Sequence, residues 1–193
     1  LVISRRNSPL VSLAYSLLSE RIPFKMKGRD FGKSMKKAIY DICFNKKRDG
    51  LKRGFDWEYF LGELEEYNRR QIKILDQRKA GQAQYISLND KIESIIILYE
   101  SSMAESPDDL LQEIDDIFPE DGGDEDVITL CSIHRAKGLE RKSVIVMEYD
   151  KLPFAWKGIT EEQQQQERNL LLVTLTRSKE YMALVNAKEK EME

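Results

Sequence analysis

The strongest constraint on the fold is that strand-like apolar runs lie near both ends of the chain. Residues 1–4 and 22–26 form such runs near the start, and residues 127–133 and 143–147 form them near the end. Between them, residues 34–117 carry apolar side chains at helical spacing. The sequence therefore predicts an α/β fold in which a parallel sheet flanked by helices is interrupted by a mostly helical insertion.

Local signals give the expected starts of several elements. Ser8 and Pro9 predict a helix start, and the resulting strand, helix and strand within 26 residues are typical of a parallel sheet. Ser87 with Asp90 resembles a capping box, and Ser106 predicts the start of another helix. The apolar runs after residue 126 are nearly continuous, which predicts strands buried on both faces. A helix over residues 161–172 and a strand over residues 181–185 are also expected.

Charge is distributed unevenly along the chain, although its net value is only −3. The first 54 residues hold 14 Lys and Arg side chains against four Asp and Glu, whereas residues 105–126 carry acidic side chains and no basic one. This separation is compatible with a phosphate-facing surface, and it also occurs on ordinary helical surfaces. We expect the helical insertion to end in an acidic loop over residues 119–126.

Composition excludes several classes of protein. Cys43 and Cys131 lie far apart in apolar contexts, which predicts reduced, buried thiols in a cytoplasmic protein. A single histidine and the lack of ligand-spaced clusters in the sequence predict no metal site built by this chain alone. No apolar run approaches the roughly 20 residues of a bilayer span, so no membrane partner is expected. The chain starts inside an apolar run without Met, which suggests a fragment of a longer protein.

The stretch from Gly28 to Ser34, GRDFGKS, is similar to a phosphate-binding loop. That loop needs four residues between its first glycine and the Gly-Lys pair, and this stretch has three. One missing residue changes which backbone N–H groups face the phosphate. We therefore interpret Gly32, Lys33 and Ser34 as a coincidence at the start of a helix. The alternative is a complete nucleotide-hydrolysing enzyme that uses Lys33.

Three motifs occur in order along the chain. The opening run Ile3-Ser-Arg-Arg-Asn7 is the first, the stretch from Ile128 to Glu140 with His-x-x-Lys-Gly-Leu-Glu is the second, and the stretch from Gln166 to Lys179 is the third. Together they resemble motifs IV, V and VI of UvrD/Rep-type superfamily 1 DNA helicases. The resemblance covers about residues 1–34 and 127–186.

The resemblance implies a RecA-like second motor domain built from residues 1–34 and 127–193. Residues 35–126 would be a reduced accessory subdomain. ATP with Mg²⁺ would be held mainly by an N-terminal RecA-like motor domain of the same protein, outside this chain. Single-stranded DNA is the implied partner, and the implied function is that of the C-terminal half of an ATP-dependent helicase or translocase.

The same resemblance assigns the nucleotide-facing residues. Arg5 and Arg177 are implied to reach the γ-phosphate as arginine fingers, with Arg5 favoured over Arg6 by register. A forked, permanently cationic side chain suits the charge on a transferring phosphoryl group. Arg177 could instead stabilise the C-terminal end of a helix. Glu140 is implied to accept a hydrogen bond from the ribose, and Gly138 and Lys137 complete the expected nucleotide-binding set.

Ser132 and His134 match positions near the single strand, where hydroxyl and imidazole donors can hold a phosphodiester without reading bases. The sequence departs from the family pattern at Ser4, Arg141 and Leu172, where aromatic residues are expected. These departures favour ATP-coupled movement on DNA over full unwinding. They also leave open a second function, a non-catalytic helicase-derived module that binds protein or DNA.

Overall fold

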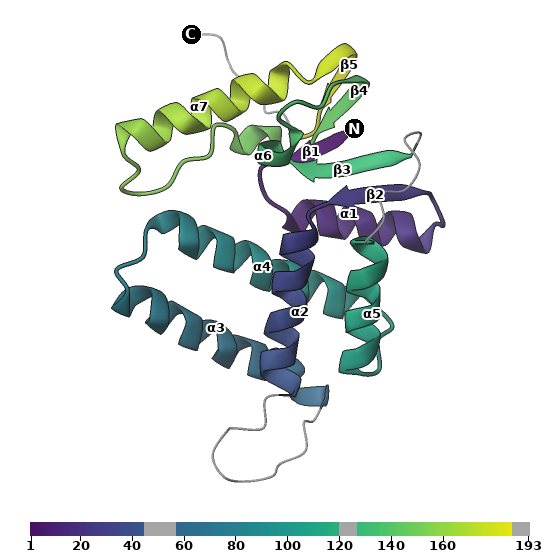
Figure 1. Ribbon diagram of the computed structural model, residues 1–193, viewed down its shortest axis with the longest axis vertical. Coiled ribbons are helices and arrows are strands. Elements are labelled where there is room, and N and C mark those ends of the chain that lie inside the picture. The colour runs from purple at the N-terminus through teal and green to yellow at the C-terminus, as the bar shows by residue number, and fades with distance from the viewer. Residues whose placement is uncertain (45–56, 120–126, 187–193) are drawn as a thin grey trace. The chain divides into compact units, whose positions relative to one another are not determined.

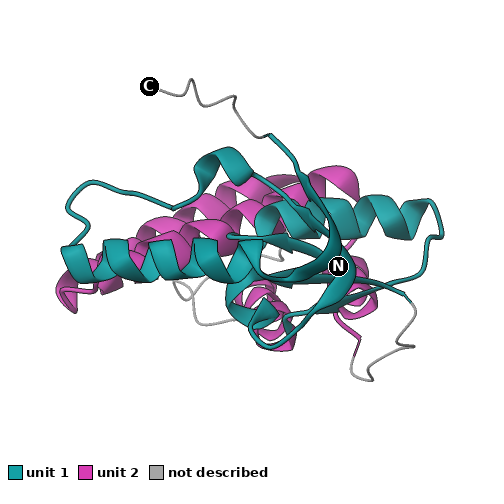
Figure 2. Ribbon diagram, turned by 90° about the horizontal axis from the view of Figure 1, so that it is seen from above, with its two compact units in different colours: residues 1–28, 122–193 teal, residues 29–121 magenta. Residues whose placement is uncertain are grey.

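The computed structural model describes residues 1–44, 57–119 and 127–186 (Figure 1). The chain divides into two compact units, residues 1–28 with 122–193 (unit 1) and residues 29–121 (unit 2), which Figure 2 colours separately. Residues 120–126 of the expected acidic loop lie outside the described residues. In the described ranges, no helix combines the length and apolar character needed to cross a bilayer.

The described part of unit 1 contains a five-stranded sheet in the order β2-β3-β1-β4-β5, and every neighbouring pair of strands is parallel. This confirms the predicted α/β class with a parallel sheet. Strand β3, from the second half of the chain, pairs between β1 and β2 from the first half. The strands are β1 (Val2–Ser4), β2 (Phe24–Lys27), β3 (Ile128–Ser132), β4 (Arg141–Val146) and β5 (Ser178–Leu184). The helices of unit 1 are α1 (Ser8–Ser19), α6 (Ile133–Ala136), the short 3-10 helix η2 (Tyr149–Lys151) and α7 (Glu161–Leu175).

Helices cover the sheet unequally. On one face, α1 contacts β1, β2 and β3. On the other, α6 and α7 contribute to a core in which Ile3, Cys131 and Val146 are buried. The expectation that both later strands are buried on both faces is wrong for β4, because α1 covers only the first three strands. Ile145, which points away from the α7 core, is 41% exposed.

Capping contacts account for the helix starts and correct one expectation. Ser106 begins α5 (Pro107–Ile117), and its hydroxyl oxygen accepts from the Asp109 N–H at 3.3 Å, as expected from the sequence. The capping box expected at Ser87 is wrong, because α4 (Gln82–Ser101) already starts five residues earlier. There the Gln84 side chain accepts from the Gly81 N–H at 3.1 Å, so an earlier pair of residues stabilises the helix start.

The regular elements in the described residues of unit 2 are all helices. The unit begins at residue 29 because α2 (Arg29–Cys43) packs against α3 (Phe60–Gln77), α4 and α5. The 3-10 helix η1 (Trp57–Tyr59) precedes α3, and its Trp57 ring lies 5.0 Å from that of Phe60. Fully buried apolar side chains from all four α-helices form the core of the unit: Met35, Ile39, Phe60, Leu64, Ile95, Leu98, Leu110 and Ile114.

Candidate functional site

Because the strands of the sheet are all parallel, they all begin on one side of the sheet and all end on the opposite side. The side where the strands begin is called the amino edge, and the side where they end is called the carboxyl edge. Arg177 lies at the amino edge, between the end of α7 and the start of β5. Its Nε donates to the Val173 carbonyl oxygen at 2.8 Å and its Nη1 to the Leu139 carbonyl oxygen at 3.2 Å. Its Nη2 donates to the Thr176 hydroxyl at 2.9 Å. The Val173 contact is the helix-end interaction considered from the sequence, and the Leu139 contact ties Arg177 to the turn before β4.

That turn holds the other expected nucleotide-binding residues. Gly138 has φ +83°, a backbone conformation that residues with a Cβ rarely adopt, which explains a glycine here. The Glu140 side chain is 53% exposed and lies 3.5 Å from the Lys179 ammonium. Lys137 is exposed, and within the described part of the chain it has no ion pair. The structure therefore brings Lys137, Gly138 and Glu140 together with Arg177 at the amino edge.

Arg5 lies at the carboxyl edge, directly after β1. Its Nη2 donates to Glu167 Oε1 at 2.6 Å, and its Nε lies 3.0 Å from Oε2 and 3.2 Å from Oε1. The two side chains are only 17% and 5% exposed. A bidentate pair of this kind is geometrically specific and binds strongly. Arg5 thus joins the end of β1 to helix α7.

Arg6, the alternative finger, also has an acidic partner. Its Nη2 donates to Glu148 Oε1 at 2.9 Å, and Lys151 pairs with the same carboxylate. These cations hold the pKa of Glu148 below its ordinary value against the opposing effect of burial, which is the largest single influence. Glu148 is therefore a partner of two cations.

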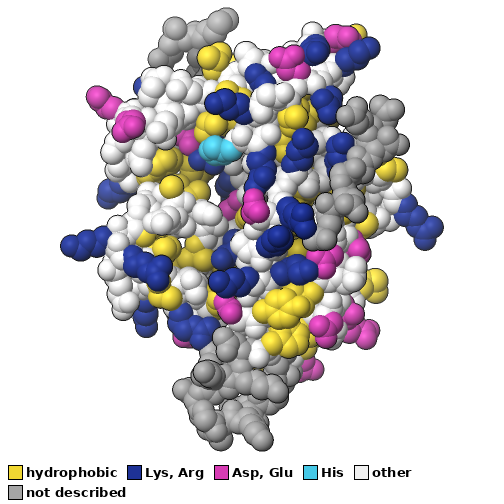
Figure 3. Space-filling model, in the orientation of Figure 1, with side chains coloured by type: hydrophobic (Ala, Val, Ile, Leu, Met, Phe, Trp, Pro, Cys, Tyr) yellow, Lys and Arg dark blue, Asp and Glu magenta, His cyan; other side chains and the backbone are white. Residues whose placement is uncertain are grey.

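Ser132 and His134 also lie at the carboxyl edge, at the end of β3 and the start of α6. Ser132 is buried, whereas His134 is exposed and, as the chain's one histidine, is the cyan side chain in Figure 3. Desolvation lowers the pKa of His134 below its ordinary value, the positive charge of Arg5 lowers it further, and Glu167 acts in the opposite direction. The imidazole is therefore neutral at pH 7, when it can both donate and accept a hydrogen bond.

The two expected arginine fingers are not brought together. At the amino edge the Arg141 N–H donates to the Arg177 carbonyl oxygen, and at the carboxyl edge the Met147 N–H donates to the Ile3 carbonyl oxygen. Six strand residues separate these contacts, which at about 3.3 Å per residue places the two edges about 20 Å apart. With Arg5 anchored at one edge and Arg177 at the other, the two guanidinium groups do not face a common phosphate.

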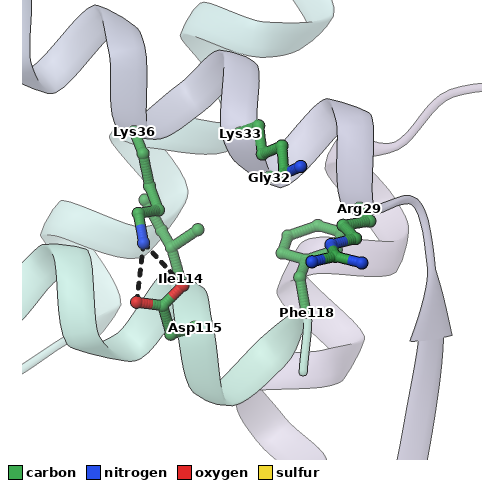
Figure 4. Close-up of a pocket in the computed structure, with 7 residues that line it drawn as sticks. All are labelled: Arg29, Gly32, Lys33, Lys36, Ile114, Asp115 and Phe118. Carbon is green, nitrogen blue, oxygen red and sulfur yellow. Dashed lines mark hydrogen bonds and ion pairs between the residues drawn. The ribbon is translucent and has the colours of Figure 1, made fainter. Parts of the chain in front are cut away.

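The GRDFGKS stretch does not form a phosphate loop. Gly32, Lys33 and Ser34 lie inside α2, which begins at Arg29. A shallow pocket of unit 2 adjoins this helix, lined by seven residues from α2 and the α5 region (Figure 4). In it Lys36 donates to both carboxylate oxygens of Asp115, at 2.6 and 2.7 Å. A Cβ on Gly32 would lie 2.9 Å from the Phe118 ring, so the glycine serves helix packing and not phosphate binding.

The donor set at the amino edge suits a nucleotide better than a metal ion. The exposed Glu140 carboxylate can accept from a ribose hydroxyl, and the cations Lys137 and Arg177 suit phosphate oxygens. In the part of the chain that the structure describes, no group of three His, Cys, Asp or Glu side chains could hold a metal ion.

Two features were missed in the sequence. Glu167 lies within the third motif and had no expected role, yet it holds Arg5. Phe154 and Trp156, between η2 and α7, have ring centroids 6.0 Å apart, and the Arg5 Cζ lies 5.5 Å from the Phe154 centroid. The sequence did contain a signal for this aromatic pair, since Phe154 and Trp156 closely follow Pro153.

Two comparisons with known proteins give the family to which this chain is similar. The model of the UvrD-like helicase C-terminal domain matches residues 64–189. The ATP-dependent DNA helicase PcrA of Bacillus subtilis (strain 168) is 36% identical over 83 residues, which cover 41% of this chain and 11% of that helicase. The chain therefore matches only a small part of that relative's length.

Proposed function

This chain belongs to the UvrD-like helicase C-terminal domain family, and on that basis we propose that it is the second motor domain of an ATP-dependent DNA helicase or translocase. A first motor domain outside this chain would hold ATP and Mg²⁺. Unit 1, whose parallel sheet carries the three motifs, would be the motor domain. The helices of unit 2 would be its accessory subdomain.

The observation that carries this proposal is the contact between Arg177 and the turn before β4. The Nη1 of Arg177 donates to the Leu139 carbonyl oxygen at 3.2 Å, so the arginine and Glu140 share the amino edge although 36 residues separate them in sequence. A cation for phosphate oxygens and a carboxylate for ribose hydroxyls are the groups needed to contact both ends of a nucleotide. Lys137 adds a second cation. At Gly138 no Cβ stands beside the backbone N–H and C=O groups of the turn.

In this proposal Arg177 alone is the arginine finger. To reach a phosphate it must exchange contacts with Val173, Leu139 and Thr176 for charge-assisted ones, which are about twice as strong as neutral hydrogen bonds. Hydrolysis would then accelerate only when the two motor domains approach each other, which links it to domain movement. Arg5 is left out of the nucleotide site because Glu167 holds it at the opposite edge.

The carboxyl edge is the proposed contact with single-stranded DNA. Ser132 and His134 lie there, and a neutral imidazole with a hydroxyl group can bind a phosphodiester without reading sequence. ATP and DNA would thus be contacted at opposite edges of the same sheet. This separation lets both ligands be bound at once.

The test is Arg177→Lys in the full-length protein. Lysine keeps the positive charge but lacks the forked guanidinium group of arginine. Loss of an arginine finger lowers kcat by a factor of about 10³ to 10⁵. We expect the kcat of DNA-stimulated ATP hydrolysis to decrease by a factor within that range, with little change in the KM for ATP. Arg168→Lys is the matched control, because Arg168 is exposed on the same helix and bonds only to Gln165 among the contacts described. Equal activity of both variants would refute the finger role.

Two further measurements separate the alternatives. The isolated chain should show negligible ATP hydrolysis, and Lys33→Ala should change nothing. Turnover that depends on Lys33 would instead favour a complete phosphate-loop enzyme.

A non-catalytic binding module is the second candidate function. Its supporting observation is that Arg177 has a structural role at the end of α7, where its Nε donates to the Val173 carbonyl oxygen at 2.8 Å. That function predicts that Arg177→Lys leaves both binding of its partner and the biological activity intact.

A further inference from the structure

One face of α2 remains exposed, whereas the opposite face is buried in the core of unit 2. The side chains of Arg29, Lys33, Lys36, Tyr40 and Phe44 recur every three or four residues, so they lie on the same face of the helix. Phe44 directly follows α2, and its N–H still donates to the Tyr40 carbonyl oxygen at 3.0 Å, which continues the helical turn. These five residues are called the α2 stripe.

The α2 stripe is cationic at one end and aromatic at the other. Arg29 and Lys33 are exposed, and among the residues described Lys33 has no ion pair. The Tyr40 and Phe44 side chains are 49% and 42% exposed, and their ring centroids lie 5.3 Å apart. Figure 3 shows basic side chains gathered over α2, an apolar patch beyond them and acidic side chains over α5. Large apolar side chains grouped on a surface and bordered by charged ones are a feature of sites that bind a partner.

A pocket of unit 2 opens at the cationic end of the stripe, between α2 and the α5 region (Figure 4). Arg29 and Phe118 lie on one side of it, and Lys36 lies on the other, where it donates to Asp115. Phe118 and Ile114, which are 5% and 1% exposed, give the pocket an apolar lining. Cationic groups around an apolar lining suit a glutamate side chain, which has both methylene groups and a carboxylate.

The charge of unit 2 favours a protein partner over a nucleic acid. Residues 29–44 and 57–119 hold ten Lys and Arg side chains against 16 Asp and Glu, so these ranges do not provide the broad positive field that holds a nucleic acid. The Asp115 carboxylate, on a side chain 52% exposed, has lone pairs beyond those that Lys36 uses. The backbone N–H groups of a peptide can donate to them, whereas the sugar-phosphate backbone of DNA has no donor.

We propose that the α2 stripe binds an acidic segment of a partner protein. Its carboxylates pair with Arg29 and Lys33, and its aromatic or large aliphatic side chains pack on Tyr40 and Phe44. The positive end of the α2 dipole adds to the attraction for carboxylates near Arg29. The stripe is about 22 Å long at 1.5 Å per residue, which a partner helix of about four turns would cover. This interaction goes beyond the proposed function, because it involves neither ATP nor DNA.

The probe is a fluorescein-labelled peptide of about 15 residues, matched to the length of the stripe, with glutamates in one half and phenylalanines in the other. Fluorescence anisotropy measures its binding to the whole chain. Two sister peptides carry glutamine in place of glutamate, or alanine in place of phenylalanine. We expect the parent peptide to bind more tightly than either sister, and to lose affinity as the salt concentration rises.

Variants of the stripe test each half separately. Lys33→Glu should weaken binding of the parent peptide by roughly 3-fold to 10-fold at low salt, and should not weaken binding of the glutamine peptide. Tyr40→Gln keeps a good helix former and should weaken binding of the parent peptide by about 5-fold to 30-fold, but not that of the alanine peptide. Losses confined to the matching peptide identify the contacting pairs.

Lys73→Glu and Ile74→Gln are the matched controls, because both side chains are exposed on α3, outside the stripe. They should leave binding of the parent peptide unchanged. Failure of the parent peptide to bind, or equal losses in the stripe and control variants, would overturn the proposal.

Two further outcomes would replace the partner proposed here. Duplex DNA that binds more tightly than the parent peptide, and loses that affinity in Lys33→Glu, would make the stripe a nucleic-acid contact. A dimer seen by sedimentation velocity and abolished by Tyr40→Gln would show that a second copy of this chain covers the stripe. Either result overturns the assignment to an acidic protein segment.

Discussion

The ion pair between Arg5 and Glu167 allows a quantitative test of what holds unit 1 together. Arg5→Met removes the guanidinium but keeps a long, unbranched side chain. The Glu167 carboxylate, on a side chain only 5% exposed, would then lose all three of its contacts with Arg5. Breaking a buried pair from one side costs about 3–5 kcal/mol, because the remaining charge stays buried and uncompensated. We expect the free energy of unfolding to fall by that amount.

The double variant Arg5→Met/Glu167→Met should recover most of this loss, since replacing both members of a buried pair by apolar side chains is often neutral. Arg69→Met is the matched control in unit 2. The Arg69 side chain is 63% exposed and pairs with Glu65 and Glu66, and exposed pairs contribute about 0–1 kcal/mol.

Urea unfolding followed by Trp156 emission, in the Trp57→Phe background, reports unit 1 directly. In a chain of this size, about 1 kcal/mol corresponds to roughly 2–4 °C in Tm, so Arg5→Met should lower Tm by on the order of 10 °C. A loss below about 1 kcal/mol, or a double variant as unstable as the sum of the single ones, would refute the reasoning.

Three further predictions follow from burial and backbone geometry. Gly32→Ala should destabilise unit 2 by about 1–3 kcal/mol, because its Cβ would lie 2.9 Å from the Phe118 ring. Gly62→Ala should stabilise it by up to about 1 kcal/mol, because its Cβ would meet nothing within 4 Å. Urea unfolding of both variants checks the opposite signs. The pKa of His134 is lowered from 6.5 in the folded state, so the unfolded chain takes up the proton first and stability should decline as pH falls below 6.5. His134→Asn should flatten that decline in urea titrations at several pH values. Burial raises the pKa of Cys131 to about 11, so at about pH 8 iodoacetamide should modify it far more slowly in the folded chain than in urea, and equal rates would contradict its burial.

The elements of the sheet were predictable because their signals are local. Continuous apolar runs indicated the strands, and Ser106 followed by a proline indicated the start of α5. The α/β class followed from the strand-like runs at both ends of the chain. The start of α4 was not predictable from Ser87 and Asp90, because the same polar residues also fit the interior of a partly exposed helix.

The arrangement of the site required more than the motifs. Arg5 follows a strand and Arg177 precedes one, so in a parallel sheet they belong at opposite edges, and strand direction could have revealed this from the sequence. The partner of Arg5 could not be inferred in the same way, because Glu167 is 162 residues away and meets it only when α7 packs on the sheet. The exposure of Ile145 likewise depends on how far α1 extends across the sheet.

Strand β4 has a mechanical consequence for this domain. It runs from the turn that holds Glu140 towards the Glu148 carboxylate, and it pairs with β5 from Arg141 to Val146 but with β1 only at Ile145 and Val146. The carboxyl half of β4 therefore has a strand neighbour on each side, whereas its first residues pair with β5 alone, across a register irregularity between Arg141 and Ser143. In unit 1, the end of β4 that leads to Glu148 is therefore held more firmly than the end that follows Glu140, so local opening of this strand should begin at the Glu140 end.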